Sequence, residues 1–211
     1  MKPNFNFKYY KEDRLILAVV ILYLLIEFLV NLAIELLAYR QLSYYRFYPS
    51  VMLMAILFGL INSYLDKSPV LWWFFMKTPL IKGYYEGYIT YVLDNVTEKK
   101  KCSVKIFQTP SKIKVHTSFW NEDEDKNKIE ETKTYSESTV EEFFENHSDI
   151  FELHFYYSNG GNLNSTIPVR RGYNVLKYNK KTKKFGGFYF SQNSKSQGSG
   201  GKMSITFKRK I

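Results

Sequence analysis

The side chains best suited to bind a ligand lie in the last third of the chain, which carries only positive charge. No aspartate or glutamate follows Glu152, whereas twelve lysines and arginines do. Arg170 and Arg171 are the strongest candidates, because a planar guanidinium binds phosphate oxygens through paired hydrogen bonds. The electrostatic field of so many positive charges attracts anions, which here could be a phosphorylated small molecule, anionic lipid headgroups or nucleic acid. For the lysines between Lys180 and Lys184, a solvated cationic turn is the simpler interpretation.

No motif in the sequence is typical of a catalytic or metal site. His116, His147, His154 and Cys102 have no metal-ligand spacing. The acidic run from Glu122 to Asp125 lacks the glycine and the final glutamate of a calcium loop, so we interpret it as a hairpin tip. The chain also has no phosphate-binding glycine loop and no nucleophile elbow. The sequence therefore predicts a binding protein that is not an enzyme and needs no cofactor or metal.

Two apolar blocks near the N-terminus predict an anchor for this cationic region. Residues 15–38 form about 36 Å of helix, which is enough to cross a bilayer core of about 30 Å. The second block is shorter, but Pro49 suits a first helical turn and aromatic residues flank the block. We predict transmembrane helices over residues 15–38 and 49–65. A helix packed in a soluble core is the alternative for either block.

Lysines and arginines set the expected orientation. They lie in residues 1–14, before the first span, and in residues 67–82, which we predict to form an interfacial linker. Both termini are therefore expected in the cytoplasm, with the chain in the inner (cytoplasmic) membrane of a bacterium as a multi-pass protein. The single cysteine, Cys102, agrees with a reducing compartment.

The first predicted span contains a polar stripe. Glu27, Asn31 and Glu35 are spaced four residues apart and share one helical face. An ionisable group at mid-membrane costs on the order of 3 kcal/mol, so this face is expected to turn toward protein or water. Two interpretations stay open. The stripe forms contacts between protomers, or Asn31 bonds to the second helix of its own chain while Glu35 reaches the interface.

Residues 83–211 predict an all-β domain. Apolar and polar residues alternate in about eight segments at the spacing of an antiparallel meander. We predict strands over residues 84–92, 102–108, 113–119, 131–136, 150–157, 173–178, 185–190 and 203–207, and one short capped helix over residues 138–146. Eight such strands at this length close into an up-and-down barrel. A two-sheet sandwich fits the same pattern, but a barrel leaves no strand edges exposed.

Strand parity predicts the side chains that line the barrel. With Tyr85, Gly87 and Ile89 facing inward, the interior is aromatic and apolar. One mouth then collects aromatic rings for bases and cations for phosphates, which suits a nucleotide. This predicted ligand-binding set is Tyr91, Thr117, Tyr157, Arg170, Arg171, Ser191 and Lys202. Plain packing explains the tyrosines equally well, and a slip of one residue would turn the set outward.

Several short segments are similar to those of a known family. They are Gly83, Tyr85 and Gly87 on the first strand, Tyr135, Ser136 and Ser138 midway, Gly187 and Tyr189 on a late strand, and Gly201, Met203 and Ile205 on the last. With two membrane helices before a strand-rich barrel, the chain resembles the two-transmembrane β-barrel effectors of CBASS anti-phage operons over nearly its whole length. It departs from them before Gly172, where relatives often have a histidine and this chain has Arg170 and Arg171.

The resemblance implies a receptor in antiviral defence. In that family a partner nucleotidyltransferase makes a cyclic dinucleotide on infection, and the barrel binds it. The effectors then form homo-oligomers and disrupt the inner membrane, which kills the infected cell by abortive infection. The expected partners are this messenger, membrane lipid and further copies of the chain, with no nucleic acid polymer. The rival interpretations are a lipid- or fatty-acid-binding protein and a structural membrane anchor.

Overall fold

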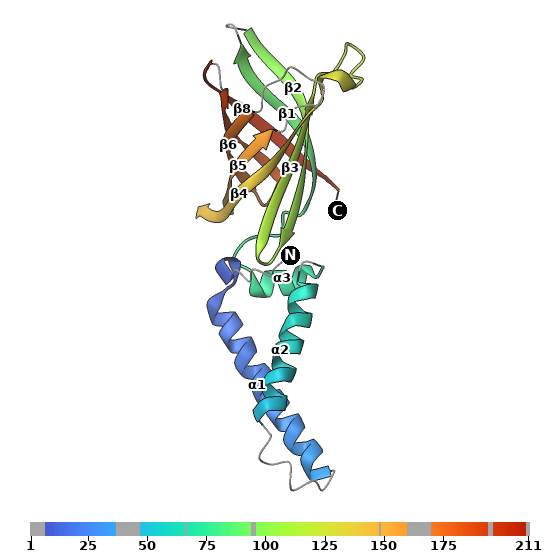
Figure 1. The fold of residues 1–211 in the computed structure, drawn as a ribbon, viewed down its shortest axis with the longest axis vertical. Coiled ribbons are helices and arrows are strands. Elements are labelled where there is room, and N and C mark those ends of the chain that lie inside the picture. The colour runs from blue at the N-terminus through green and yellow to red at the C-terminus, as the bar shows by residue number, and fades with distance from the viewer. Residues whose placement is uncertain are drawn as a thin grey trace. The chain divides into compact units, whose positions relative to one another are not determined.

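The computed structural model describes residues 7–36, 47–65, 67–93, 96–147, 149–159, 170–193 and 196–209. The chain divides into two compact units, one helical and one made of strands. The helical unit comprises residues 1–80 and 109–111, and the strand unit comprises residues 81–108 and 112–211. Figure 1 traces both units along the chain.

The helical unit contains one helix long and apolar enough to cross a membrane. Helix α1 (Glu12–Leu36) follows the short 3-10 helix η1 (Phe7–Tyr9), and its 22-residue segment Glu12–Ala33 measures about 33 Å. Most of its apolar side chains are exposed, including Ile16 and Phe28, each with 64% of its surface accessible. Such a surface is stable in lipid and unfavourable in water.

The structure does not support the predicted second span. Helix α2 (Phe47–Tyr64) has an apolar segment of only 13 residues, Met52–Tyr64. That segment covers roughly 20 Å of helix, short of a hydrocarbon core of about 30 Å. Among the described residues, α1 is therefore the one helix that meets the length criterion.

The predicted interfacial linker contains a third helix, α3 (Pro69–Phe75). The side chains of Lys11 and Arg14 donate hydrogen bonds to its last carbonyl oxygens, Lys11 Nζ to Trp73 O at 2.8 Å and Arg14 to Phe74 O at 3.2 Å. Both cations also lie over the Trp73 ring, 5.4 and 5.2 Å from its centroid. Cations beside an exposed tryptophan are typical of a membrane–water interface.

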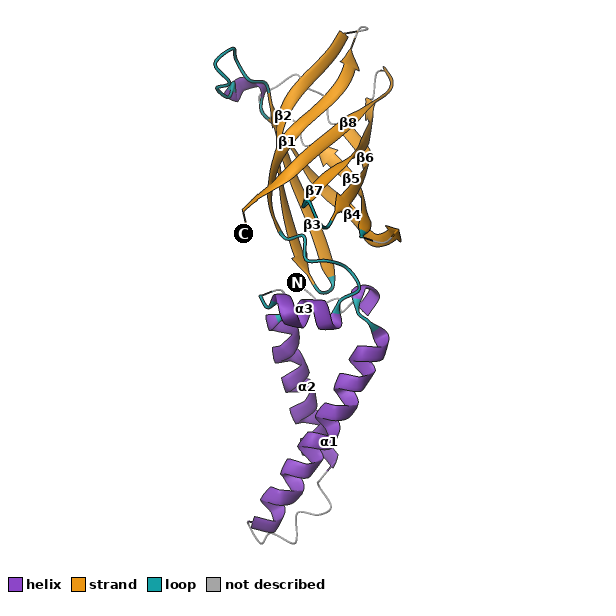
Figure 2. Cartoon of the chain, turned by 180° about the vertical axis from the view of Figure 1, so that it is seen from behind, coloured by secondary structure: helices purple, strands orange, loops and turns teal. Residues whose placement is uncertain are grey.

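The strand unit is a closed, antiparallel eight-stranded barrel, as predicted, so the sandwich alternative is wrong. The strands follow one another in sequence order, and β8 pairs with β1 to close the wall. Figure 2 shows them in orange, curving around one interior. They are β1 (Gly83–Leu93), β2 (Val96–Thr109), β3 (Lys112–Trp120), β4 (Thr134–His147), β5 (Ile150–Asn159), β6 (Arg170–Asn179), β7 (Lys184–Asn193) and β8 (Ser196–Arg209).

The predicted helix over residues 138–146 is wrong, because this segment is part of β4. It pairs with β5 from Ser136 to His147, so its backbone hydrogen bonds go to the neighbouring strand. Phe143 is buried in the barrel core, while Glu142 and Phe144 on either side of it are exposed. Alternation of buried and exposed residues is typical of a strand in a sheet. Pairing with β5 therefore overrides the local sequence preference for a helix.

Burial confirms the predicted strand parity and divides the interior into two layers. Toward the start of β1 the core is apolar and packed, with Tyr85, Ile106 and Phe185 at most 1% exposed. Farther along the barrel the buried inward-facing side chains include four hydroxyl groups, those of Thr117, Ser136, Ser138 and Ser191. The buried Asn174 pairs directly with the apolar Phe155, so the two layers meet at this level.

Candidate ligand-binding site at the β3–β4 seam

β3 and β4 pair over only a short stretch of the barrel wall. These strands share only four residue pairs, from His116↔Glu137 to Phe119↔Thr134, whereas β4 and β5 share ten. Beyond the four pairs β4 diverges from β3, as Figure 1 shows. We call this divergence the seam. It leaves backbone groups of β3 without the ladder partner that a regular sheet would supply.

Ser138 closes part of the seam with its side chain. The backbone N–H of Val115 donates to Ser138 Oγ at 2.8 Å, and the Ser138 hydroxyl in turn donates to Glu141 Oε1. A register shift in β4 follows directly, between Ser138 and Val140. The bulge lets β4 diverge from β3, and the side-chain bond joins the two strands at this point and satisfies the Val115 N–H.

A hollow of about 900 Å³ lies at the seam. Its volume falls within the range of pockets that hold small molecules. The lining comes from five strands and is mostly hydroxyl-bearing or basic. It comprises Tyr84, Ser103, Lys105, Lys112, Lys114, His116, Thr117, Ser118, Tyr135, Ser136, Glu137, Ser138, Thr139 and Ser158.

The charge of the lining favours an anion. Three lysines, Lys105, Lys112 and Lys114, face one acid, Glu137. Lys114 Nζ lies 2.6 Å from Glu137 Oε1, and His116 Nε2 lies 3.5 Å from the same oxygen. The hydrogen bond to Lys114 holds the pKa of Glu137 below its usual range, and the same bond raises the pKa of Lys114. Both groups are charged at neutral pH, and an excess of positive charge remains for a ligand.

The hollow also reaches inward-facing groups. Thr117, Ser136 and Ser138 are buried on the inner side of the wall, at 3%, 7% and 2% exposure, yet all three line the hollow. Outer cations and inner hydroxyls therefore meet at one opening. Such a site can fix phosphate oxygens by charge and the rest of a polar ligand by hydrogen bonds.

The structure does not gather the predicted ligand-binding set on one face. Tyr91, Thr117, Tyr157 and Ser191 lie on inward-facing positions, whereas Arg171 and Lys202 are exposed on the outside. Arg170 begins β6, and its side chain lies outside the described part of the chain.

Two members of the predicted set touch the hollow or border it. Thr117 lines it, and Arg171 pairs across β5 and β6 with Ser158, which also lines it. Tyr157 instead packs inside the barrel against Gly172, where a Cβ atom would meet the phenol ring at 2.4 Å. Its hydroxyl donates to Phe190 O at 3.4 Å. Tyr157 therefore packs within the barrel, and its ring leaves no room for a side chain larger than that of glycine at position 172.

Sequence reasoning missed the cations of the hollow. Lys112, Lys114 and His116 alternate with the buried residues Ile113 and Val115, so the sequence already placed them on the outer face of one strand. This alternation is the sequence signal that identifies them as outward-facing cations. The earlier strands also carry acids, so their positive charge is less conspicuous than that of the acid-free C-terminal third.

The polar stripe of α1 also has a defined environment. Asn31 Oδ1 is buried and accepts no hydrogen bond from any residue that the structure describes. The amide oxygen of Asn62 on α2 instead accepts from the Tyr10 hydroxyl. Glu27 is half-buried and Glu35 is exposed. Asn31 Oδ1 therefore accepts no hydrogen bond from α2 within the described ranges, and it is a buried acceptor on the helix that meets the span criterion.

A second polar cluster surrounds Glu152 on the outer side of β4, β5 and β6. Glu152 is only 8% exposed, and its oxygens accept from Asn146 Nδ2 at 2.6 Å and contact His154 Nε2 at 2.8 Å. The Tyr173 hydroxyl lies 2.5 Å from His154 Nδ1, and Lys177 Nζ lies 3.5 Å from Glu152 Oε1. The bond to His154 holds the pKa of Glu152 below its usual range.

We expect Glu152→Gln to lower the free energy of unfolding at pH 7 by about 1.5–3 kcal/mol, the usual loss for a hydrogen bond to a charged group. A lowered pKa in the folded state stabilises the fold above the ordinary carboxyl pKa, and that stabilisation disappears as pH falls through the lowered value. Urea unfolding of the full chain in detergent should therefore show a gap between wild type and variant that closes in acid. Glu145→Gln, at an exposed position, is the control, and a gap independent of pH would contradict this role.

Comparisons of the sequence with models of known protein families and with curated proteins return no match.

Proposed function

We propose that this protein is a membrane-anchored receptor whose barrel binds a cyclic dinucleotide. The hollow at the seam carries this proposal, because it combines a suitable volume with an excess of lysine and many hydroxyl groups. A cyclic dinucleotide presents two phosphodiester charges and two flat bases. Lys112 and Lys114 would contact the phosphates, and the rings of Tyr84 and Tyr135 would stack on the bases.

Binding at the seam would act on the membrane through assembly of the chain. We propose that α1 spans the bacterial inner membrane, that the whole 18-residue length of α2, about 27 Å, crosses beside it as the second span, and that both termini lie in the cytoplasm. The buried acceptor of Asn31 would then gain a donor from a second copy when the helices cluster. The result would be membrane disruption and death of an infected cell, the role of a CBASS effector in anti-phage defence.

Titration calorimetry of the full chain in lipid nanodiscs tests the binding step. We expect heat from 3′,3′-cyclic diguanylate or from a cyclic dinucleotide with other bases, and none from inorganic phosphate at the same concentration. If no cyclic dinucleotide in a panel of base combinations produces heat, the receptor function fails. Acyl chains found by mass spectrometry in the purified protein would instead favour a lipid-binding barrel.

A further inference from the structure

Helix α3 has one buried side and one exposed side within the helical unit. Trp72 and Phe75 are buried, and the Trp72 indole donates to Thr78 O at 2.7 Å. Val70 and Trp73, three residues apart on the same side of the helix, are 73% and 63% exposed. Two large apolar side chains therefore project from a helix whose other side is fixed in the protein.

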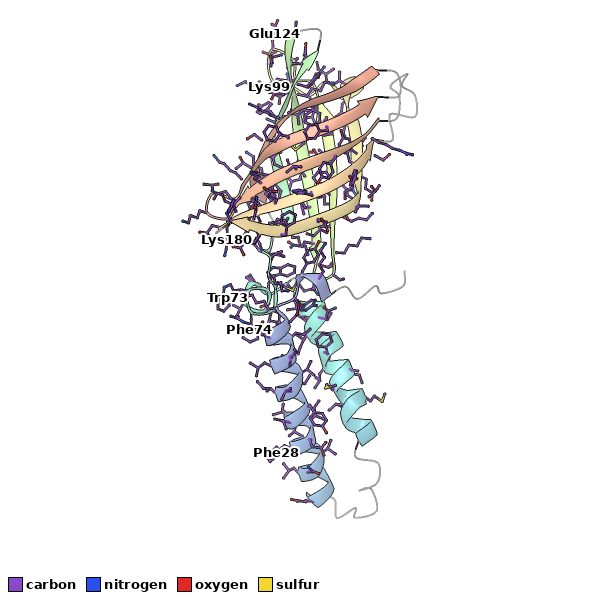
Figure 3. All side chains as sticks on the ribbon, turned by 90° about the vertical axis from the view of Figure 1, so that its left-hand side faces the viewer. Phe28, Trp73, Phe74, Lys99, Glu124 and Lys180 are labelled. Carbon is purple, nitrogen blue, oxygen red and sulfur yellow. The ribbon has the colours of Figure 1, made fainter. Side chains whose placement is uncertain are left out.

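The C-terminal end of α3 is joined to the segment that leads into α1. Tyr10 and Met76 form an isolated antiparallel bridge, and a backbone hydrogen bond from Lys11 N to Phe75 O, at 2.8 Å, continues it. Figure 3 shows the result, with Trp73 beside the end of α1 at which the helix begins. The exposed indole therefore has a defined position relative to α1.

Two cations lie against this indole. Lys11, directly before α1, and Arg14, in its first turn, are the residues that donate to the last carbonyl oxygens of α3 and cover the Trp73 ring. The Arg14 guanidinium also lies over Phe74, 5.0 Å from the ring centroid. A guanidinium has five N–H donors, and its bond to Phe74 O uses one of them. Arg14 is thus held in place while donors remain that can bind an anion.

These groups lie just outside the apolar surface of α1. That surface begins directly after Arg14, with Ile16 and Leu17 at 64% and 53% exposure. Because such a surface is suited to the hydrocarbon core, Lys11 and Arg14 lie at the depth of the lipid phosphates. Tryptophan is enriched at the same depth. The placement of α1 in a bilayer therefore brings lipid headgroups to these side chains.

The charge around the two cations favours an anionic headgroup. Residues 8–14 and 66–77 contain five basic and three acidic residues. One of the acids, Glu12, is paired with Lys77 at 3.0 Å. An excess of positive charge beside a bilayer attracts anionic lipid, whereas a zwitterionic headgroup would add a further cation next to Lys11 and Arg14.

We propose that Lys11, Arg14 and Trp73 form a binding site for the phosphate of an anionic phospholipid, which we call the lipid site. The Arg14 guanidinium contacts two phosphate oxygens, Lys11 supplies a second charge, and Trp73 and Val70 lie among the upper acyl carbons. The bound lipid fixes the depth of α1 and holds α3 in the plane of the interface. This inference rests on the proposed placement of α1 in the membrane and is independent of ligand binding to the barrel.

Native mass spectrometry of the full chain in detergent tests the lipid site. The protein is titrated with dioleoyl phosphatidylglycerol and, separately, with dioleoyl phosphatidylcholine, which has the same acyl chains. We expect phosphatidylglycerol to bind at least about tenfold more tightly. Inorganic phosphate at the same concentration should not compete, because it lacks the acyl chains that place a lipid at this depth.

The double variant Lys11→Ala, Arg14→Ala should weaken phosphatidylglycerol binding at least about tenfold and leave phosphatidylcholine binding unchanged. The control is Lys180→Ala with Lys181→Ala, which removes the same charge from an exposed turn of the barrel. This control should keep the wild-type preference for phosphatidylglycerol.

Quenching of tryptophan fluorescence gives a second readout that needs no change to the cations. The full chain is placed in nanodiscs that contain equal amounts of the two lipids, with bromine on the acyl chains of only one of them. We expect stronger quenching when phosphatidylglycerol carries the bromine. Trp73→Phe should remove this difference, since Trp72 is buried and Trp120 lies in the barrel strand β3.

The lipid site is wrong if wild type binds the two lipids equally, if the two brominated lipids quench equally, or if the barrel control loses as much binding as the Lys11, Arg14 variant. Calorimetry with 3′,3′-cyclic diguanylate separates this result from the proposed receptor function, because the lipid-site variant should bind the messenger as wild type does. A full chain that does not enter nanodiscs would overturn both the membrane placement and the lipid site.

Discussion

Replacing Lys112 and Lys114 together by alanine is expected to weaken the binding of a cyclic dinucleotide at least about 100-fold. Each lysine would lose a charge-assisted hydrogen bond to phosphate, worth about 1.5–3 kcal/mol, and two such losses exceed 2.8 kcal/mol. Both residues line the hollow, and both lie on β3 at outward positions, so the barrel core is unchanged. Calorimetry of the full chain in nanodiscs measures the effect.

The control for this variant removes the same charge elsewhere on the barrel. Lys180→Ala with Lys181→Ala lies in the turn between β6 and β7, away from the lining of the hollow. It should leave affinity within a factor of two or three, because exposed charges beyond a Debye length of about 8 Å are screened. Equal losses in the two double variants would mean that net charge, and not the hollow, attracts the ligand.

Replacing Glu27, Asn31 and Glu35 together by leucine is expected to abolish killing of host cells while ligand affinity stays unchanged. The reason is that Asn31 Oδ1 is buried on α1 and accepts no hydrogen bond within the described ranges, so its donor would come from another copy. Leucine removes the acceptor and stabilises the single helix in lipid. Colony counts after induction of the protein with its messenger measure killing.

A matched variant keeps the number of substitutions but avoids the stripe. Leu17, Leu24 and Phe28 are exposed on α1 at 53%, 60% and 64%, and their replacement by isoleucine retains an apolar helix. This control should kill normally. A stripe variant that still kills at wild-type doses of messenger would show that the polar face has only a structural role.

The local pattern of the sequence predicts the barrel well, because its strands bury one face. Val104 and Ile106 on β2, and Leu153 and Phe155 on β5, are all buried at alternate positions. A strand with one buried face shows period-two alternation, which a single sequence displays directly. The same alternation predicts which side chains line the interior.

The misassigned helix has a specific cause. Ser138 and Glu141 have the spacing of a helix-capping pair, and their side chains do form a hydrogen bond. In the barrel, however, Ser138 accepts from Val115 N–H of β3, so the pair closes the seam and caps no helix. The Ser138–Glu141 pair is compatible both with the start of a helix and with a strand. Which of the two forms depends on whether a neighbouring strand is available to pair with this segment.

The hollow depends on contacts that a single sequence does not reveal. It exists because β4 leaves β3 after four residue pairs, and that length is set by how eight strands close into one wall. Lys112 and Lys114 were visible as outward residues, but their meeting with Ser136 and Ser158 follows from this divergence. The length of the second apolar segment was similarly ambiguous, since aromatic flanks suggested a span that the helix itself does not reach.

Photo-crosslinking with an azido-substituted cyclic dinucleotide tests the central claim most directly. The full chain in nanodiscs is irradiated with the probe, digested, and mapped by mass spectrometry, with unlabelled messenger as competitor. We predict competed adducts on the β3 and β4 peptides that line the hollow, within residues 112–118 and 135–139. Adducts confined to other strands, or labelling that the competitor does not reduce, would contradict binding at the seam.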